Sequence, residues 1–246
     1  MANETVSYDA DEPSRDTLSL AEYVVWRGAN ADTIDVSRRR SRVMRAVDSG
    51  LKKTLDLTGA FAGLILLFPL FVAISVAIKT TSRGPVFFRQ QRYGRDGTPF
   101  TVLKFRSMHM HLCDKSGVAQ TVEDDPRVTA VGGFLRKSNF DELPQLINVL
   151  KGDMSLVGPR PHVPGMLAAG MPYEHFDTRY MTRHRVLPGI TGLAQVNGFR
   201  GETRDPYAAR MRLEYDLAYI RRQSVFLDIR ILATTVVKEF FKGKGY

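Results

Sequence analysis

One stretch of the chain is continuously apolar: in residues 57–78 every side chain is uncharged, and most are Leu, Ile, Val, Phe or Ala. With a rise of about 1.5 Å per residue, a helix of this length is able to cross the roughly 30 Å hydrocarbon core of a membrane. The pattern therefore predicts a membrane helix. Lys52 and Lys53 precede it and Lys79 and Arg83 follow it, whereas a simple crossing usually concentrates Lys and Arg on one side.

Pro69 lies near the middle of this apolar run. A proline there removes one helix hydrogen bond and clashes with the preceding turn, which predicts a bend between two arms. Positive charge at both ends fits a re-entrant hairpin with both ends in the cytoplasm. An ordinary Pro-kinked crossing fits these residues equally well.

After the membrane segment the pattern changes to two β-rich runs, residues 84–93 and 98–108, separated by a turn that contains an Asp-Gly pair. This arrangement predicts a β-hairpin. Lys104 and Arg106 alternate with apolar residues, so we expect both cations to project from one face of the second strand. A plain solvated strand face is the alternative interpretation.

Two helices are predicted near the end of the chain. Residues 206–222 form the first, opened by Asp205, and residues 224–242 form the second, with Ser224 as its cap. The second is rich in Phe, Leu, Ile and Val and ends in the lysines Lys238, Lys242 and Lys244. It fits an amphipathic helix on an anionic membrane surface, and equally a core helix with a basic end.

Composition limits the class of protein. A chain of 246 residues with 43% hydrophobic residues suits one catalytic domain with extensions. The single cysteine, Cys113, excludes an internal disulfide, and a net charge of +9 favours an anionic partner. The start is acidic, with no signal peptide pattern, and residues 18–26 suit a short helix or docking segment. We predict an α+β, mainly helical fold: a partly disordered extension over 1–50, a membrane segment over 51–83, and a cytoplasmic domain over 84–246.

Asp141 and Glu142 stand at a predicted helix start, because Pro144 is tolerated in a first turn and poorly later. The unpaired amides and positive dipole end of a helix keep a carboxylate ionised, as a nucleophile or metal ligand requires. They also attract phosphate. The alternative is simple capping, by Asp141 or by a capping box of Asn139 and Glu142.

Arg160 lies between two prolines, Pro159 and Pro161, each of which fixes the local backbone. An arginine held in this way suits bidentate recognition of phosphate. A rigid surface turn is the alternative. The five histidines show no spacing typical of a metal site.

The order of these motifs resembles the bacterial sugar transferase family, the monotopic phosphoglycosyl transferases in their compact exopolysaccharide-initiating form. The similarity runs from near Lys52 to near Lys238. The motifs that carry it are Lys52-Lys-x-x-x-Asp56, the Pro-broken apolar run, Gly84-Pro-Val-Phe-Phe, Lys104-Phe-Arg-Ser-Met, Asp141-Glu-Leu-Pro-Gln, Gly152-Asp-Met-Ser-Leu-Val-Gly-Pro-Arg-Pro and Arg183-His-Arg-Val-Leu-Pro-Gly-Ile-Thr-Gly-Leu-Ala-Gln-Val-Asn-Gly198.

The resemblance implies a re-entrant membrane helix on the cytoplasmic face of the bacterial inner membrane, and a two-step transfer. Asp141 would attack the β-phosphate of a UDP-sugar, UMP would leave, and undecaprenyl phosphate would take the hexose-1-phosphate from the aspartyl intermediate. Mg²⁺ bound through Asp141 would offset charge repulsion, and Glu142 would assist the second attack. The implied substrate-binding residues are Lys104, Arg106, Pro159, Arg160, Pro161 and Gln195.

The partners implied are the UDP-sugar donor, the undecaprenyl phosphate acceptor and membrane lipid, with no nucleic acid, while a homo-oligomer is left open. Residues 196–203 resemble members that begin exopolysaccharide repeat units with glucose or galactose. Phe68 departs from the family pattern, because many members have serine before the membrane proline.

Two other functions compete with this interpretation. A membrane-tethered protein that binds nucleic acid or lipid through its basic clusters would not need Asp141 or Glu142. An inactive scaffold of a polysaccharide assembly complex could retain every motif in a structural role.

Overall fold

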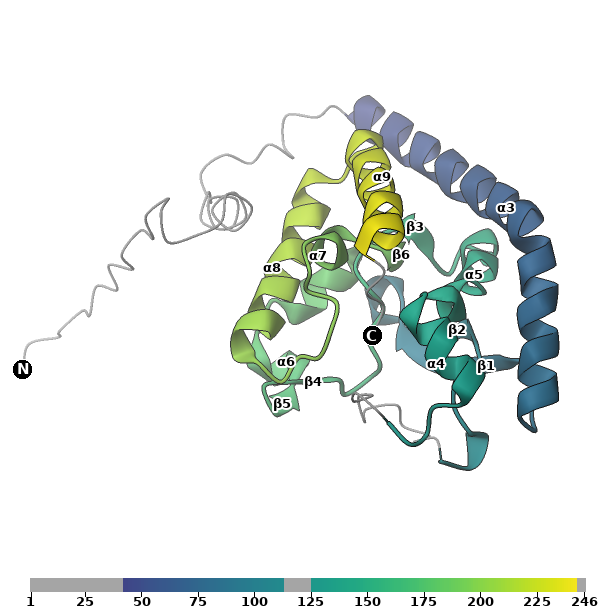
Figure 1. Ribbon diagram of the computed structural model, residues 1–246. Helices are drawn as coiled ribbons and strands as arrows, with labels where there is room; N and C mark the ends of the chain where they lie inside the picture. Colours follow the sequence, from purple (N-terminus) through teal and green to yellow (C-terminus); the bar gives the residue numbers. More distant parts are fainter. Residues whose placement is uncertain (1–41, 113–124, 243–246) are drawn as a thin grey trace, which may run out of the picture. The chain divides into compact units, whose positions relative to one another are not determined.

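The computed structural model describes residues 42–112 and 125–242, which lie within one compact unit, Val36–Tyr246. Within these ranges the fold is mainly helical, with small two-stranded sheets (Figure 1), as predicted. The predicted segment over 18–26 and most of the predicted extension over 1–50 lie outside the described residues. The elements are α3 (Arg42–Thr81), β1 (Phe87–Tyr93), η1 (Arg95–Gly97), β2 (Pro99–Phe105), η2 (Met110–Leu112), α4 (Ala130–Lys137), η3 (Phe140–Glu142), α5 (Gln145–Lys151), β3 (Ser155–Val157), β4 (Leu167–Ala168), β5 (Met171–Pro172), α6 (Tyr173–Phe176), η4 (Tyr180–Arg185), β6 (Gly189–Thr191), α7 (Leu193–Val196), α8 (Pro206–Arg222) and α9 (Val225–Lys242).

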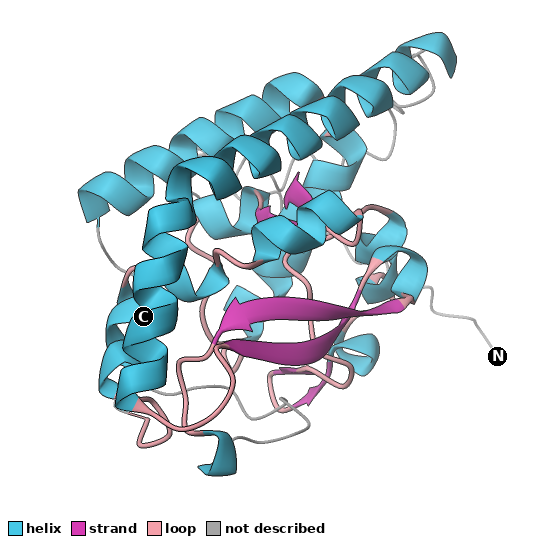
Figure 2. Ribbon diagram, turned by 90° about the vertical axis from the view of Figure 1, so that its right-hand side faces the viewer, coloured by secondary structure: helices cyan, strands magenta, loops and turns pink. Residues whose placement is uncertain are grey.

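The predicted β-hairpin is confirmed. Strands β1 and β2 pair in antiparallel register, with Phe87 opposite Phe105 (Figure 2). Asp96 and Gly97 both take left-handed backbone conformations, with φ of 54° and 76°. Asp and Gly tolerate that region better than most residues, which is why this pair makes the turn.

The two C-terminal helices are also confirmed. The side chain of Asp205 accepts hydrogen bonds from the first amides of α8, and Pro206 occupies the first turn. Ser224 caps α9 by accepting from the amide of Leu227 at 3.3 Å.

Helix α3 contains the apolar run, and its segment Val47–Thr81 is long and apolar enough to cross a membrane by length and composition. It is one helix with Pro69 inside it, and it changes direction along its length (Figure 1). The helix begins at Arg42, within the stretch predicted as an extension. The re-entrant hairpin remains a prediction.

Polar contacts hold the first half of α3. The ammonium of Lys52 contacts Ser155 Oγ at 2.7 Å and Asp228 Oδ2 at 2.7 Å, and so joins α3 to β3 and α9. One turn later, Asp56 accepts from Ser155 Oγ at 3.0 Å and from the amide of Leu156 at 2.9 Å. Because Asp228 is fully buried, the lysine neutralises a charge that has no access to water.

Arg106 holds the other end of α3. Its guanidinium donates to the carbonyls of Ser82 at 2.8 Å and Ile78 at 3.3 Å, and also to that of Arg83. Cations at a helix C-terminus satisfy carbonyls that have no partner within the helix. Arg106 is 2% exposed. The structure therefore shows a structural task for Arg106, and its predicted substrate-binding role stays a prediction.

The short parallel pair β3–β6 leads into the Pro-Arg-Pro segment. Ser155 lies opposite Gly189, and Val157 opposite Thr191. A Cβ at Gly158 would come within 2.4 Å of the carbonyl oxygen of Leu187. Only glycine allows this approach, and it fixes where the segment leaves the strand.

We predict that Lys52→Met lowers the free energy of unfolding by about 3–5 kcal/mol, because it leaves the buried carboxylate of Asp228 without its cation. Thermal unfolding in detergent measures the loss. Lys53→Met is the matched control, since Lys53 is the exposed neighbour. Equal losses in the two variants would contradict this account of the contact.

Candidate active site

Asp141 and Glu142 lie in η3, a single turn immediately before α5, and each is 6% exposed. Asn139 enters this turn with a left-handed φ of 58°. The caps of η3 and α5 use no side-chain hydrogen bond. The structure therefore does not support the capping alternative, and the two carboxylates serve something other than the helix.

Glu142 is surrounded by cations. Arg160 binds it in a bidentate manner, with Nη2 at 2.6 Å from Oε1 and Nη1 at 3.0 Å from Oε2. Lys104, which reaches it from β2, places Nζ at 2.7 Å from Oε1. Arg200 adds a third cation, at 3.4 Å from Oε2. The structure thus brings together Lys104 and Arg160, which were predicted, and Arg200, which was not.

Asp141 is less tightly matched. Its nearest cation in the described part of the chain is Lys104, at 3.8 Å. Lys104, Arg160 and Arg200 supply three positive charges against the two carboxylates. Three cations gathered at one place provide the charge-assisted donors that a phosphate would bind.

The pKa values of the two adjacent carboxylates are shifted in opposite directions. Burial alone would raise the pKa of Glu142, but the charges of Arg160 and Lys104 outweigh it and hold that pKa well below its usual value. Burial raises the pKa of Asp141, against the opposing charge of Lys104. Burial and the neighbouring charges account for both shifts, and the expectation that the helix start keeps the carboxylates ionised stays a prediction. Neighbouring groups whose pKa values are pushed apart are typical of sites with divided roles.

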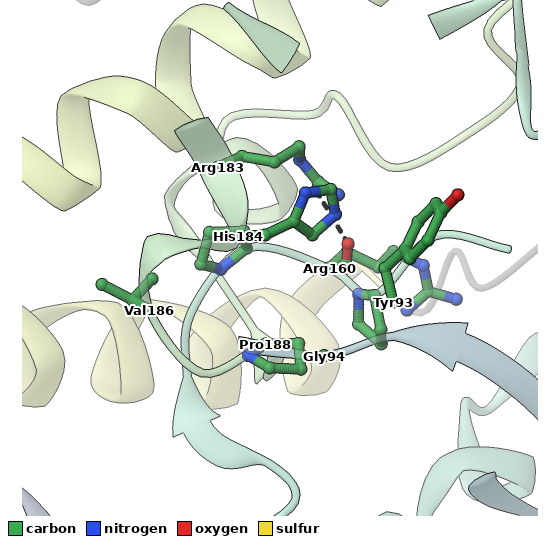
Figure 3. Close-up of a pocket in the computed structure, with 9 residues that line it drawn as sticks. Tyr93, Gly94, Arg160, Arg183, His184, Val186 and Pro188 are labelled. Atoms are coloured by element: carbon green, nitrogen blue, oxygen red, sulfur yellow. Dashed lines mark hydrogen bonds between the residues drawn. The ribbon is translucent and has the colours of Figure 1, made fainter. Parts of the chain in front are cut away.

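The backbone around Arg160 is held at four successive carbonyls. Those of Pro159 and His162 accept from the amides of Gly189 at 3.0 Å and Tyr93 at 2.9 Å. The carbonyl of Arg160 accepts from Arg183 at 2.7 Å (Figure 3), and that of Pro161 from Arg92 at 3.0 Å. The prolines are buried and Arg160 is half-buried. The segment is therefore rigid, as predicted, and its guanidinium points to Glu142.

Arg183 is buried in an ion pair with Asp216 of α8, at 2.7 Å, with side chains 1% and 2% exposed. Beside it, His184 lines a hollow of about 160 Å³ next to the Pro-Arg-Pro segment (Figure 3). Burial and then the charge of Arg183 lower the pKa of His184 to about 3, so its ring is neutral.

Two other residues near the site differ from the sequence analysis. Gln195, in α7, donates from Nε2 to the carbonyl of Ile190 at 3.2 Å, a contact within its own segment. Its predicted substrate contact stays a prediction. Arg92 was not predicted as a site residue. Burial and then the positive charge of Arg160 lower the pKa of Arg92 to about 10, so the two arginines interact electrostatically. Its position in a strand gave no signal of this.

A magnesium site was predicted at Asp141. Among the described residues no group of three or more Asp, Glu, His or Cys side chains is able to hold a metal by itself. Mg²⁺ typically takes one or two carboxylates and completes its shell with water and substrate phosphates. Asp141, whose carboxylate receives no hydrogen bond within the described part, fits that limited demand.

Comparison with known proteins shows which family this sequence resembles. Residues 47–242 match the family model described as bacterial sugar transferase. The chain is 48% identical over 200 residues to an exopolysaccharide production protein of Rhizobium leguminosarum bv. phaseoli. The aligned residues are 81% of this chain and 100% of that protein.

Two further relatives share one name, UDP-glucose:undecaprenyl-phosphate glucose-1-phosphate transferase. The protein of Escherichia coli (strain K12) is 49% identical over 203 residues, which are 82% of this chain and 43% of that protein. The protein of Caulobacter vibrioides is 46% identical over 231 residues, 93% of this chain and 84% of that protein. The chain thus spans less than half of the first and most of the second.

The lowered pKa of Glu142 predicts a pH-dependent stability difference. Because this pKa is lower in the fold than in the unfolded chain, the ion pairs stabilise the fold above the ordinary value of 4.5, and the contribution is lost as the pH falls toward the folded pKa. Glu142→Gln should therefore lower the free energy of unfolding by about 2 kcal/mol at neutral pH, and the gap to wild type should narrow in acid.

Melting temperatures of both proteins across the acid range measure this effect. Glu202→Gln is the control, since Glu202 pairs with the exposed Arg204. A gap that stays constant with pH would contradict the assignment.

Proposed function

The chain belongs to the bacterial sugar transferase family, and we propose that it transfers hexose-1-phosphate from a UDP-sugar to undecaprenyl phosphate and releases UMP. The observation that carries this proposal is a buried Asp-Glu pair matched with Lys104 and Arg160. The names of the Escherichia coli and Caulobacter relatives favour glucose as the sugar. The name of the Rhizobium relative favours a role in exopolysaccharide production.

Asp141 is the nucleophile of the first step. A carboxylate oxygen forms a bond to the β-phosphorus of the donor, the bond from that phosphorus to the bridging oxygen breaks, and UMP leaves with the electron pair. The geometry supports Asp141 over Glu142 for this task. Glu142 is bound by three cations, whereas Asp141 has Lys104 at 3.8 Å and a raised pKa, which makes it the more basic carboxylate.

In the second step an oxygen of undecaprenyl phosphate attacks the same phosphorus and releases Asp141. Glu142 assists this attack. Its low pKa makes it a poor base while Arg160 and Lys104 hold it, so the phosphates of the substrates must first draw these cations away. The same cations then neutralise charge that develops on the transferring phosphate.

Asp141 is the residue that would hold Mg²⁺, which would supply Lewis-acid stabilisation of the leaving group. Lys104 and Arg160 hold donor phosphate or nucleotide groups. Pro159 and Pro161 keep the arginine in place.

Helix α3 enters and leaves the same face of the membrane. Lys52 near its start and Ile78 near its end both contact the same compact unit. The stretch between them is about 39 Å long at 1.5 Å per residue, more than the hydrocarbon thickness. A straight crossing would carry one of these contacts to the far side. Both contacts therefore favour the re-entrant form.

The outer face of α3 and part of α9 are the surfaces that contact lipid. On α3, side chains around Pro69 are strongly exposed, with Leu66 at 80% and Phe68 at 66%. On α9, Ile231 is buried while Phe226 is 79% exposed. This two-sided pattern combines both alternatives for the C-terminal helix, because one face packs on the core and the other is apolar and open. Exposed apolar area of this kind marks a membrane or partner surface. We place both surfaces at the cytoplasmic side of the inner membrane.

We predict that the purified protein with UDP-glucose alone releases up to about one equivalent of UMP and retains a phosphosugar, because the first step needs no lipid. Undecaprenyl phosphate should then give turnover. Asp141→Asn should abolish both products without unfolding, since it removes only the charge.

Glu142→Gln is the companion variant, and it should mainly slow the step that needs lipid. A folded wild type that releases no UMP from UDP-glucose, UDP-galactose or their N-acetyl forms would refute the function. Near-normal turnover by Asp141→Asn would refute the mechanism alone.

The re-entrant topology predicts that both ends of α3 label from one side. Single cysteines at Lys53 and Lys79, which are exposed, would be treated with an impermeant thiol reagent in oriented vesicles after replacement of Cys113. Both should react from the cytoplasmic side. Reaction from opposite sides would establish a crossing helix instead.

A further inference from the structure

Residues 197–204 connect α7 to α8 and carry Arg200, a cation that the sequence analysis did not assign. Its guanidinium lies 3.4 Å from Glu142 Oε2, and its side chain is 23% exposed, the same fraction as Arg160. The two arginines thus approach one carboxylate from two separate segments. Each side chain keeps part of its surface open to solvent.

Two other residues of this connection, Phe199 and Thr203, have structural tasks. The ring of Phe199 packs on Tyr215 of α8, with centroids 5.4 Å apart. Thr203 is 1% exposed and donates to the carbonyl of Leu167 at 2.7 Å. These contacts anchor the connection on both sides of Arg200, so its direction toward Glu142 is set by the fold.

Arg212 of α8, which is 3% exposed, donates hydrogen bonds to the residues on both sides of Arg200. It donates from Nε to the carbonyl of Phe199 at 2.9 Å, and from Nη2 to that of Gly201. The arrangement parallels that around Arg160, whose carbonyl accepts from the buried Arg183. In both cases a buried arginine holds the backbone at or next to an arginine of the site. Arg212 lies in α8 itself, and Arg183 is paired with Asp216 of α8.

Resting on the function proposed above, we propose that Arg200 is a second substrate-binding arginine, which with Arg160 clamps the diphosphate of the nucleotide sugar, and that Arg212 is its positioning residue. A diphosphate carries more negative charge than Glu142 alone is able to offer, and two convergent guanidiniums match its separate phosphates. Arg200 would exchange its longer contact with Glu142 for a phosphate.

The test is the affinity of the purified full-length protein for UDP, measured by calorimetry in detergent with magnesium. Arg200→Ala should weaken UDP binding roughly 10- to 100-fold, the loss expected for a charge-assisted contact. Arg204→Ala is the matched control, because Arg204 lies on the same connection and is 72% exposed. It should bind UDP as wild type does.

The positioning role has its own readout. Arg212→Lys keeps the charge but cannot hold two carbonyls in one planar fork, so UDP binding should weaken. In the Arg200→Ala background the same change should cause no further loss, because its effect passes through Arg200. An additive loss would overturn the positioning role. Should Arg212→Lys fail to fold, Arg200→Ala still decides the main point.

Unchanged UDP affinity in Arg200→Ala would overturn the clamp, and so would a change confined to the KM for undecaprenyl phosphate, which would assign Arg200 to the acceptor phosphate. Both results are distinct from failure of the proposed function, in which the wild type itself would release no UMP from any UDP-sugar.

Discussion

Glu142 is a buried carboxylate that must keep its charge, and the cost of burying an unmatched charge is large. The surrounding structure meets this constraint with cations from three distant segments: Lys104 from β2, Arg160 from the Pro-Arg-Pro segment and Arg200 from the connection before α8. Each segment is fixed by contacts away from the site. The position of one acidic side chain therefore depends on much of the domain.

Elements with local signals were predictable from the sequence. The limits of α8 follow from Asp205 and Pro206, because a capping side chain and a first-turn proline act within a few residues. The hairpin follows from strand alternation and from Asp96 and Gly97, which accept left-handed backbone. The rigidity at Arg160 follows from its two flanking prolines.

The contacts that side chains make were harder to predict from the sequence, because their partners lie in distant parts of the chain. Alternation placed Lys104 and Arg106 together, yet Arg106 stands just beyond the end of β2 and meets the carbonyls that end α3. Nothing near Arg200 in sequence reveals that Glu142 is its neighbour. The pKa of Asp141 likewise depends on burial, which a local helix-start argument does not include. The resemblance to a family implied a role for each carboxylate, but it did not indicate that the fold shifts their pKa values in opposite directions.

The backbone of the Pro-Arg-Pro segment has little to offer a ligand. Two of its residues have no amide hydrogen, and the carbonyls from Pro159 to His162 already accept hydrogen bonds. The guanidinium of Arg160 is therefore the group of this segment that is suited to bind a ligand, and the remainder of the segment holds it in position. Such a division would permit the base or sugar preference of the enzyme to change elsewhere in the chain, while the phosphate contact proposed for Arg160 stays the same.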